Sequence, residues 1–202
     1  MKIAIIGTHS TGKTTILENL SDYFRELGKE VITLPEYARL CPFPINENTT
    51  LEAQKWILLS QITEENKIDH KDKILLSDRG TIDNFAYLYR IGQSEAIENF
   101  ERCAVAHMKT YDFVFKTQKL SLAAKEDGIR TTDLEFRDMI DRLISHLLMK
   151  HSIKYLNLPE TIDYETHIEF IGKELGLEKK VPKNSVIAPA RLWREPNKAI
   201  SA

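Results

Sequence analysis

The chain has 202 residues, of which 42% are hydrophobic and 29% charged, so it is too apolar for a disordered protein and long enough for one domain with a small appendage. Lys and Arg number 28 against 30 Asp and Glu, and this balance argues against a broad nucleic-acid or anionic membrane surface. Apolar runs such as 3–6 and 56–59 are far shorter than the roughly 18 residues of a membrane helix. With no leader pattern and only two cysteines, we expect a cytoplasmic protein.

Strands and helices are predicted to alternate along the chain. Five apolar runs predict buried strands at residues 3–6, 31–34, 74–76, 113–115 and 153–156. Apolar stripes with helical spacing predict helices at residues 13–27, 49–62, 82–89, 94–105, 132–147 and 168–175. The alternation predicts an α/β fold, in which helices cover both faces of a parallel sheet.

Several residues mark the ends of these helices. Thr49 with Glu52, and Thr132 with Glu135, fit the capping box of a helix N-terminus. Glycines follow two of the stripes, at Gly28 and Gly176. Glycine is common just after a helix because it adopts the left-handed conformation at no steric cost. We therefore expect helices to begin at the two threonines and to end before the two glycines.

A phosphate-binding motif lies at the junction of the first strand and the first helix. Residues 7–14 fit the pattern G-x-x-x-x-G-K-[ST] of a P-loop, whose glycines let backbone N–H groups turn toward phosphate. Lys13 supplies a charge for the β- and γ-phosphates, and the Thr14 hydroxyl is placed to ligate Mg²⁺. The expected residues of the ATP site are Gly7, Thr8, His9, Ser10, Thr11, Gly12, Lys13, Thr14 and Thr15.

Charged residues follow the second and third predicted strands. Asp78 comes just after the run 74–76, the position from which a Walker B carboxylate reaches Mg²⁺. Glu36 and Arg39 follow the run 31–34, beside the place where an acceptor would sit. Because ligands of an open parallel sheet gather beyond the carboxyl ends of its strands, we predict that these residues face the P-loop. The alternative for each is a solvated loop charge.

These segments give the sequence a family resemblance. Residues 78–87 resemble the Asp-Arg segment and following helix of thymidylate kinases, and Pro35-Glu36 resembles the segment of deoxynucleoside kinases whose Glu acts as base on a sugar hydroxyl. The whole set is most similar to the P-loop family AAA-type domain 28, which includes the nicotinamide riboside kinase domain of a bacterial NAD-salvage protein. That family pairs its P-loop with a Glu-Tyr-Ala-Arg segment, here 36–39, and an Asp-Gly-x-Arg segment, here 127–130.

The resemblance covers residues 1–176 and implies a three-layer P-loop fold of the nucleoside and nucleotide kinase type, with parallel strand order 2-3-1-4-5. It also implies a lid at about residues 118–132, from which Arg130 closes over the transferred group, with Arg137 as the second choice. Among acceptor residues, location favours Tyr37 as a stacking side chain. The resemblance implies that Arg79 contacts the acceptor or its phosphate and that Asp83 holds a sugar hydroxyl.

The catalytic base has two candidates because the sequence departs from the known patterns. Thymidylate kinases carry an Arg-Glu-Pro-Gly type segment after the second strand, and deoxynucleoside kinases pair their base with Glu-Arg-Ser. This chain has Pro-Glu-Tyr-Ala-Arg at 35–39 and Asp-Arg-Gly at 78–80. The base is therefore either Glu36 or Asp78, and we assign Glu36 to the acceptor side and Asp78, with Thr14, to Mg²⁺.

The sequence thus predicts an enzyme that uses ATP and Mg²⁺ to phosphorylate a hydroxyl or phosphate of a small nucleoside- or nucleotide-like molecule. One alternative is a regulatory or hydrolytic ATPase or GTPase that acts with a protein partner. Another is a nucleotide-dependent binding module with negligible turnover. The basic, proline-containing tail at 177–202 could dock on the domain or bind a partner or a second copy of the chain.

Overall fold

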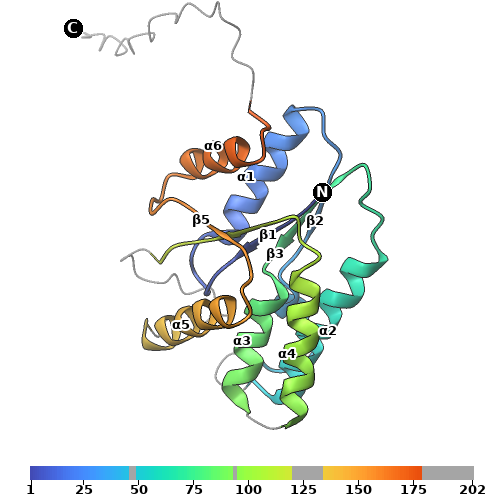
Figure 1. Ribbon diagram of the computed structural model, residues 1–202, viewed down its shortest axis with the longest axis vertical. Coiled ribbons are helices and arrows are strands. Elements are labelled where there is room, and N and C mark those ends of the chain that lie inside the picture. The colour runs from blue at the N-terminus through green and yellow to red at the C-terminus, as the bar shows by residue number, and fades with distance from the viewer. Residues whose placement is uncertain (46–48, 93–94, 120–133, 179–202) are drawn as a thin grey trace, which may run out of the picture.

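The computed structural model describes residues 1–45, 49–92, 95–119 and 134–178, and its centre is a parallel sheet (Figure 1). The strands are β1 (Lys2–Ile6), β2 (Val31–Leu34), β3 (Ile74–Asp78), β4 (Phe113–Lys116) and β5 (Leu156–Asn157). Their order is β2-β3-β1-β4-β5, and all neighbours pair in parallel. The predicted fold class and strand order are confirmed.

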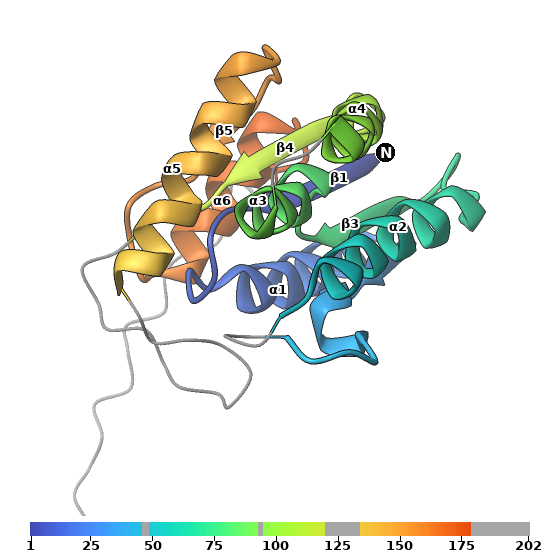
Figure 2. The same ribbon diagram turned by 90° about the horizontal axis from the view of Figure 1, so that it is seen from below.

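Helices cover both faces of the sheet, as Figure 2 shows. One face carries α1 (Lys13–Glu26) and α6 (Tyr164–Glu174). The other carries α2 (Leu51–Lys67), α3 (Thr81–Ile91), α4 (Glu95–Met108) and α5 (Leu134–Lys150), and a short 3₁₀ helix, η1 (Tyr37–Leu40), follows β2. In the part of the chain that the structure describes, no helix combines the length and apolarity needed to cross a membrane.

The apolar run in β1 is continuous because both faces of this central strand are buried. Ile3 and Ile5 belong to the core beneath α1 and α6, whereas Ala4 and Ile6 belong to the core beneath the other helices. All four side chains are fully buried. Successive side chains of a strand point to opposite faces, so a strand between two helical layers must be apolar at every position.

The helix ends agree in part with the sequence signals. Gly28 and Gly176 both follow a helix with positive φ, +72° and +64°, as predicted. The capping box at Thr49 is wrong by one residue, because α2 is capped by Thr50, whose Oγ1 accepts from the Ala53 N–H at 3.2 Å. Thr132 lies outside the described residues.

The fifth strand also differs from its prediction at 153–156. Ser152 has φ +51°, and the Ile153 N–H donates to the Leu148 carbonyl at 3.0 Å, so these residues form the C-terminal turn of α5. Ile153 packs against the helical core, and β5 begins only at Leu156. An apolar residue that closes a helix and one that opens a short edge strand look alike in sequence.

A buried carboxylate on α2 gathers donors from the sheet and from the region of α4. Glu65 Oε2 lies 2.8 Å from Lys2 Nζ and 2.7 Å from His107 Nε2, while Oε1 accepts from Ser77 Oγ and Tyr111 Oη, both at 2.8 Å. Burial by itself would raise the pKa of Glu65, but the bonds from His107 and Lys2 outweigh it and lower the pKa to about 2. Glu65 is therefore a buried carboxylate that is ionised at neutral pH.

Replacing this carboxylate should destabilise the protein strongly. Glu65→Gln leaves Lys2 buried without its counter-charge, and we expect a loss of about 3–5 kcal/mol in the free energy of unfolding. The neighbouring Glu64 is 45% exposed and pairs with Lys67, so Glu64→Gln should change stability by less than about 1 kcal/mol. Urea denaturation of both variants measures the difference.

The same pair of variants tests the pH dependence. The lowered pKa of Glu65 contributes stability that is complete above about pH 4.5 and is lost as the pH falls toward 2. The difference in the free energy of unfolding between the wild type and Glu65→Gln should therefore become smaller as the pH is lowered. If Glu65→Gln lowered the free energy of unfolding at neutral pH by no more than Glu64→Gln does, Glu65 would not be an ionised carboxylate that stabilises the interior.

Candidate functional site

The P-loop lies between β1 and α1, and its two glycines occupy positions that other residues fit poorly. Gly7 has φ +135° and Gly12 has φ +79°, both in the range that favours glycine. A Cβ on Gly7 would overlap Thr117 Oγ1, which follows β4. A Cβ on Gly12 would lie 3.2 Å from the ring of Tyr164, at the start of α6. The loop is thus enclosed closely on the side of β4 and α6.

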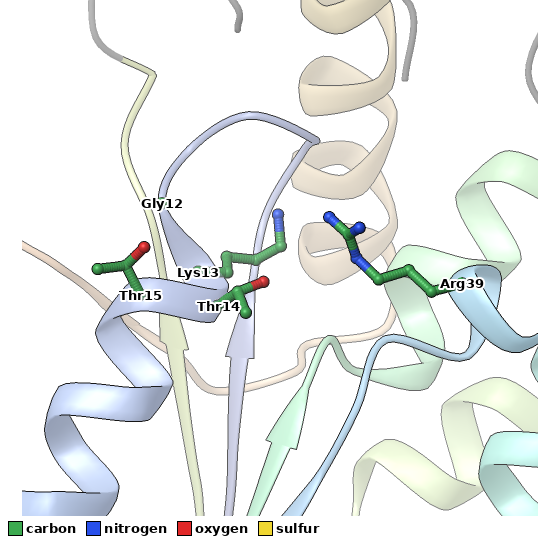
Figure 3. A pocket seen from close by; sticks show the side chains of 5 residues that line it. All are labelled: Gly12, Lys13, Thr14, Thr15 and Arg39. Carbon is green, nitrogen blue, oxygen red and sulfur yellow. The ribbon is translucent and has the colours of Figure 1, made fainter. Parts of the chain in front are cut away.

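Lys13 opens α1 and points into the cavity beside the loop. Its side chain and that of Arg39 face each other in Figure 3. The two residues line a cavity of about 190 Å³ together with Gly12, Thr14 and Thr15. Lys13 Nζ donates to the Thr8 carbonyl at 2.5 Å. Burial, reinforced by the charge of Arg79, lowers the pKa of Lys13 to about 7. The surroundings of Lys13 therefore stabilise its charged form poorly, and an anionic ligand would stabilise that form far more.

Thr14 and Asp78, the two residues predicted to ligate Mg²⁺, lie side by side. The Thr14 hydroxyl donates to Asp78 Oδ2 at 2.6 Å, although the two residues come from α1 and from the end of β3. The second oxygen of Asp78, Oδ1, is buried and has no hydrogen-bond partner among the described residues. Buried carboxylate oxygens are normally satisfied, so this one can accept from a water molecule or coordinate a cation.

Glu36 and Arg79 form a buried ion pair between the ends of β2 and β3. Glu36 Oε1 accepts from Arg79 Nε and Nη2, each at 2.7 Å, and both side chains are only 4% exposed. Burial disfavours the guanidinium charge, but the Glu36 carboxylate outweighs it and raises the pKa of Arg79. From the cavity side, Arg39 Nε lies 3.4 Å from Glu36 Oε2. Arg39, which lines the same cavity as Lys13, therefore connects the Glu36–Arg79 pair to that cavity.

Asp83 has a different setting from the one expected. It is fully buried, and its carboxylate accepts from the backbone N–H of Gly7, at 3.2 and 3.3 Å, and of Gly80, at 3.2 Å. Burial raises the pKa of Asp83 to about 6. This geometry argues against contact with a sugar hydroxyl, because the carboxylate instead ties the P-loop to the start of α3.

Two further residues of the predicted site, Tyr37 and His9, are buried. Tyr37 is 6% exposed, and burial with Glu64 and Glu65 nearby raises its pKa to about 12, so its ring is packed rather than presented for stacking. His9 is buried in the loop, with Nδ1 3.1 Å from Tyr87 Oη.

The predicted lid falls largely outside the described residues, Arg130 included. On the N-terminal side of the residues that are not described, Lys119 Nζ lies 2.8 Å from Asp138 on α5. On their C-terminal side, the carbonyl of Arg137 accepts from the Thr8 hydroxyl at 3.1 Å. Arg137 itself is buried at the start of α5. The start of α5 is therefore held directly against the P-loop.

Two residues of the site were missed by the sequence analysis. Thr117 Oγ1 hydrogen-bonds with Thr11 Oγ1 at 2.7 Å and donates to the Ile6 carbonyl at 3.1 Å. Gln61 on α2 donates to the Arg79 carbonyl at 2.8 Å. The place of Thr117 just after a predicted strand was a usable signal, whereas nothing in the local sequence distinguishes Gln61 from a surface glutamine.

Comparison with known proteins is consistent with this geometry. The sequence matches the model of the AAA domain family AAA_28 over residues 2–166. The chain belongs to this family. A comparison with curated proteins finds no match.

Several solved structures share the fold at low sequence identity. A NadR protein in complex with NAD and AMP-PNP superposes with a TM-score of 0.69 at 16% identity, over 91% of this chain and 51% of that chain. A NadR complex with NR gives 0.70 at 19% identity, over 88% and 52%. A deoxyadenosine kinase from M. mycoides with dCMP and dCDP bound gives 0.59 at 18%, over 87% and 98%. The chain spans about half the length of the NadR chains, and these likenesses establish a P-loop kinase fold.

Proposed function

We propose that this protein is a Mg²⁺-dependent kinase that transfers the γ-phosphoryl group of ATP to a small nucleoside- or nucleotide-like acceptor. The observation that carries the proposal is that the Glu36–Arg79 pair lies at the same edge of the sheet as Lys13 and the Thr14–Asp78 pair. A hydrolase needs only the second set. The structures similar in fold support the proposal, because they include a complex with AMP-PNP and a deoxyadenosine kinase with bound dATP.

On the donor side, the P-loop backbone and Lys13 would hold the triphosphate. In the structure, Lys13 Nζ donates to the Thr8 carbonyl of its own loop. A phosphate oxygen is a stronger partner for an ammonium than a carbonyl, so binding should move Nζ from Thr8 to the ligand. Lys13 then stabilises charge that spreads over the γ-phosphoryl oxygens during transfer.

Mg²⁺ fits the Thr14–Asp78 pair. A hydroxyl and a carboxylate oxygen are hard ligands of the kind Mg²⁺ prefers, and Asp78 Oδ1 is buried without a hydrogen-bond partner in the described structure. When bound with ATP, the ion would supply positive charge to the β- and γ-phosphoryl oxygens. The hydrogen bond from the Thr14 hydroxyl keeps Asp78 Oδ2 in a fixed orientation.

On the acceptor side, Glu36 would orient the attacking hydroxyl and accept its proton. Arg79 fixes the Oε1 side of the carboxylate, and Arg39 approaches Oε2 from the cavity. Arg39 is 37% exposed and lines the cavity, so it can also contact a charged group of the acceptor. Asp78 is assigned to the metal side because its carboxylate is already bonded to Thr14.

ATP binding should take up a proton at alkaline pH. The pKa of Lys13, about 7 in the free protein, must rise when an anion binds, so near pH 8 binding recruits about one proton. The apparent affinity should fall by up to about tenfold per unit between pH 8 and pH 9. Calorimetry in two buffers of different ionisation enthalpy counts the proton, with Lys67→Met, which removes an exposed lysine on α2, as the control. A binding enthalpy that does not depend on the buffer would contradict this role of Lys13.

Glu36→Gln should abolish transfer without abolishing nucleotide binding. The amide keeps the shape of the carboxylate but cannot accept the proton, and we expect the acceptor-dependent rate of ADP formation to fall by about 10²–10⁴-fold. The dissociation constant of a non-hydrolysable ATP analogue should change by less than about threefold, since Glu36 lies on the acceptor side.

The matched control is Glu30→Gln, which removes a 64% exposed carboxylate just before β2 and should transfer at the wild-type rate. Transfer by Glu36→Gln at the wild-type rate would show that Glu36 is not the base. Steady ATP hydrolysis that no acceptor accelerates would favour the hydrolytic alternative.

A further inference from the structure

Arg79 has a backbone conformation that its own residue type does not favour. Its φ is +88°, in the left-handed region that residues with a Cβ rarely adopt. Two hydrogen bonds fix its backbone: its N–H donates to the Ile5 carbonyl at 3.1 Å, and its carbonyl accepts from Gln61 Nε2 at 2.8 Å. The direction of the guanidinium, toward Glu36 and the Gly7 carbonyl, depends on this conformation.

Gln61 is itself held in one orientation. It is 1% exposed on α2, and its Oε1 accepts from Asn84 Nδ2 at 2.5 Å, on α3. Its Nε2 lies 2.8 Å from Glu65 Oε1, an ionised carboxylate, as well as from the Arg79 carbonyl. Turning the amide over would bring oxygen against two acceptors and nitrogen against a donor. The Gln61 side chain is therefore a fixed donor aimed at the Arg79 peptide.

We propose that Gln61, oriented by Asn84, is a positioning residue for the acceptor side of the reaction. It holds the Arg79 peptide so that the guanidinium meets Glu36, and through Arg79 it sets where the Glu36 carboxylate lies. The catalytic part of this inference rests on the proposed function, whereas the positioning of Arg79 does not. The effect should concern the acceptor more than ATP, because Arg79 bonds to Glu36 at 2.7 Å but to the Gly7 carbonyl of the P-loop only at 3.4 Å.

The chain offers a matched control on the same helix. Gln54 is also buried, at 6% exposure, but its Nε2 donates to Thr49 Oγ1 at 2.9 Å, at the start of α2. Gln61→Met and Gln54→Met make the same chemical change, which keeps length and removes the amide. A general cost of burying methionine in α2 would appear in both variants.

The first readout is hydrogen exchange of the Arg79 Nε–H, measured by nuclear magnetic resonance, which needs no acceptor. This proton is buried and bonded to Glu36 Oε1 at 2.7 Å. Gln61→Met should speed its exchange at least tenfold relative to the amide of Ile5, while Gln54→Met should leave the ratio unchanged. If Gln61→Met does not fold, Asn84→Ala, which frees the Gln61 amide to turn, should give an increase in the same direction.

The second readout is steady-state kinetics with an acceptor that the wild-type protein phosphorylates. Gln61→Met should lower kcat/KM for the acceptor at least tenfold and change the dissociation constant of an ATP analogue less than threefold, and Gln54→Met should change neither. Unchanged Arg79 exchange in both Gln61→Met and Asn84→Ala would overturn the positioning role. Faster exchange in a protein that phosphorylates no acceptor would instead overturn the proposed function and leave the structural role standing.

Discussion

Strand β3 pairs in parallel with β1 on one side and with β2 on the other, and the whole site depends on this arrangement. It places the segments after three strands next to one another: the P-loop after β1, Glu36 after β2, and Asp78 with Arg79 at the end of β3. Each segment is far from the others in sequence. Without this pairing, the P-loop and the Glu36 carboxylate would not lie at the same edge of the sheet.

Parallel pairing also buries charge, and the site is arranged to offset that cost. Arg79 pairs with Glu36, and the Asp83 carboxylate accepts hydrogen bonds from backbone N–H groups. Lys13 donates to a carbonyl of its own loop. Lys13 is the least satisfied of these groups, as its lowered pKa shows. In the proposed function, an incoming triphosphate improves the surroundings of Lys13 and leaves the Glu36–Arg79 pair to act on the acceptor.

Local patterns were sufficient for four of the five strands, for the place of the P-loop and for the place of the charged residues at strand ends. The P-loop is contiguous, and residues such as Asp78 directly follow an apolar run, so their neighbours in sequence report their place in the fold. The links that orient the site are not local: Gln61 reaches the Arg79 carbonyl across 18 positions, and Lys2 reaches Glu65 from another element. Polar pairs of this kind carry no periodicity, so the sequence did not predict them. For the same reason, the sequence did not predict that Asp83 would tie down backbone.

In the proposed reaction, a phosphoryl group leaves ATP for a small molecule rather than for water. The most direct measurement incubates the wild-type protein with Mg²⁺ and ATP labelled in the γ-phosphoryl group, together with nucleosides, nucleoside monophosphates and nicotinamide riboside. Mass spectrometry then follows the label. We expect one labelled acceptor molecule for each ADP formed. Label that appears only in inorganic phosphate, whichever acceptor is present, would contradict it.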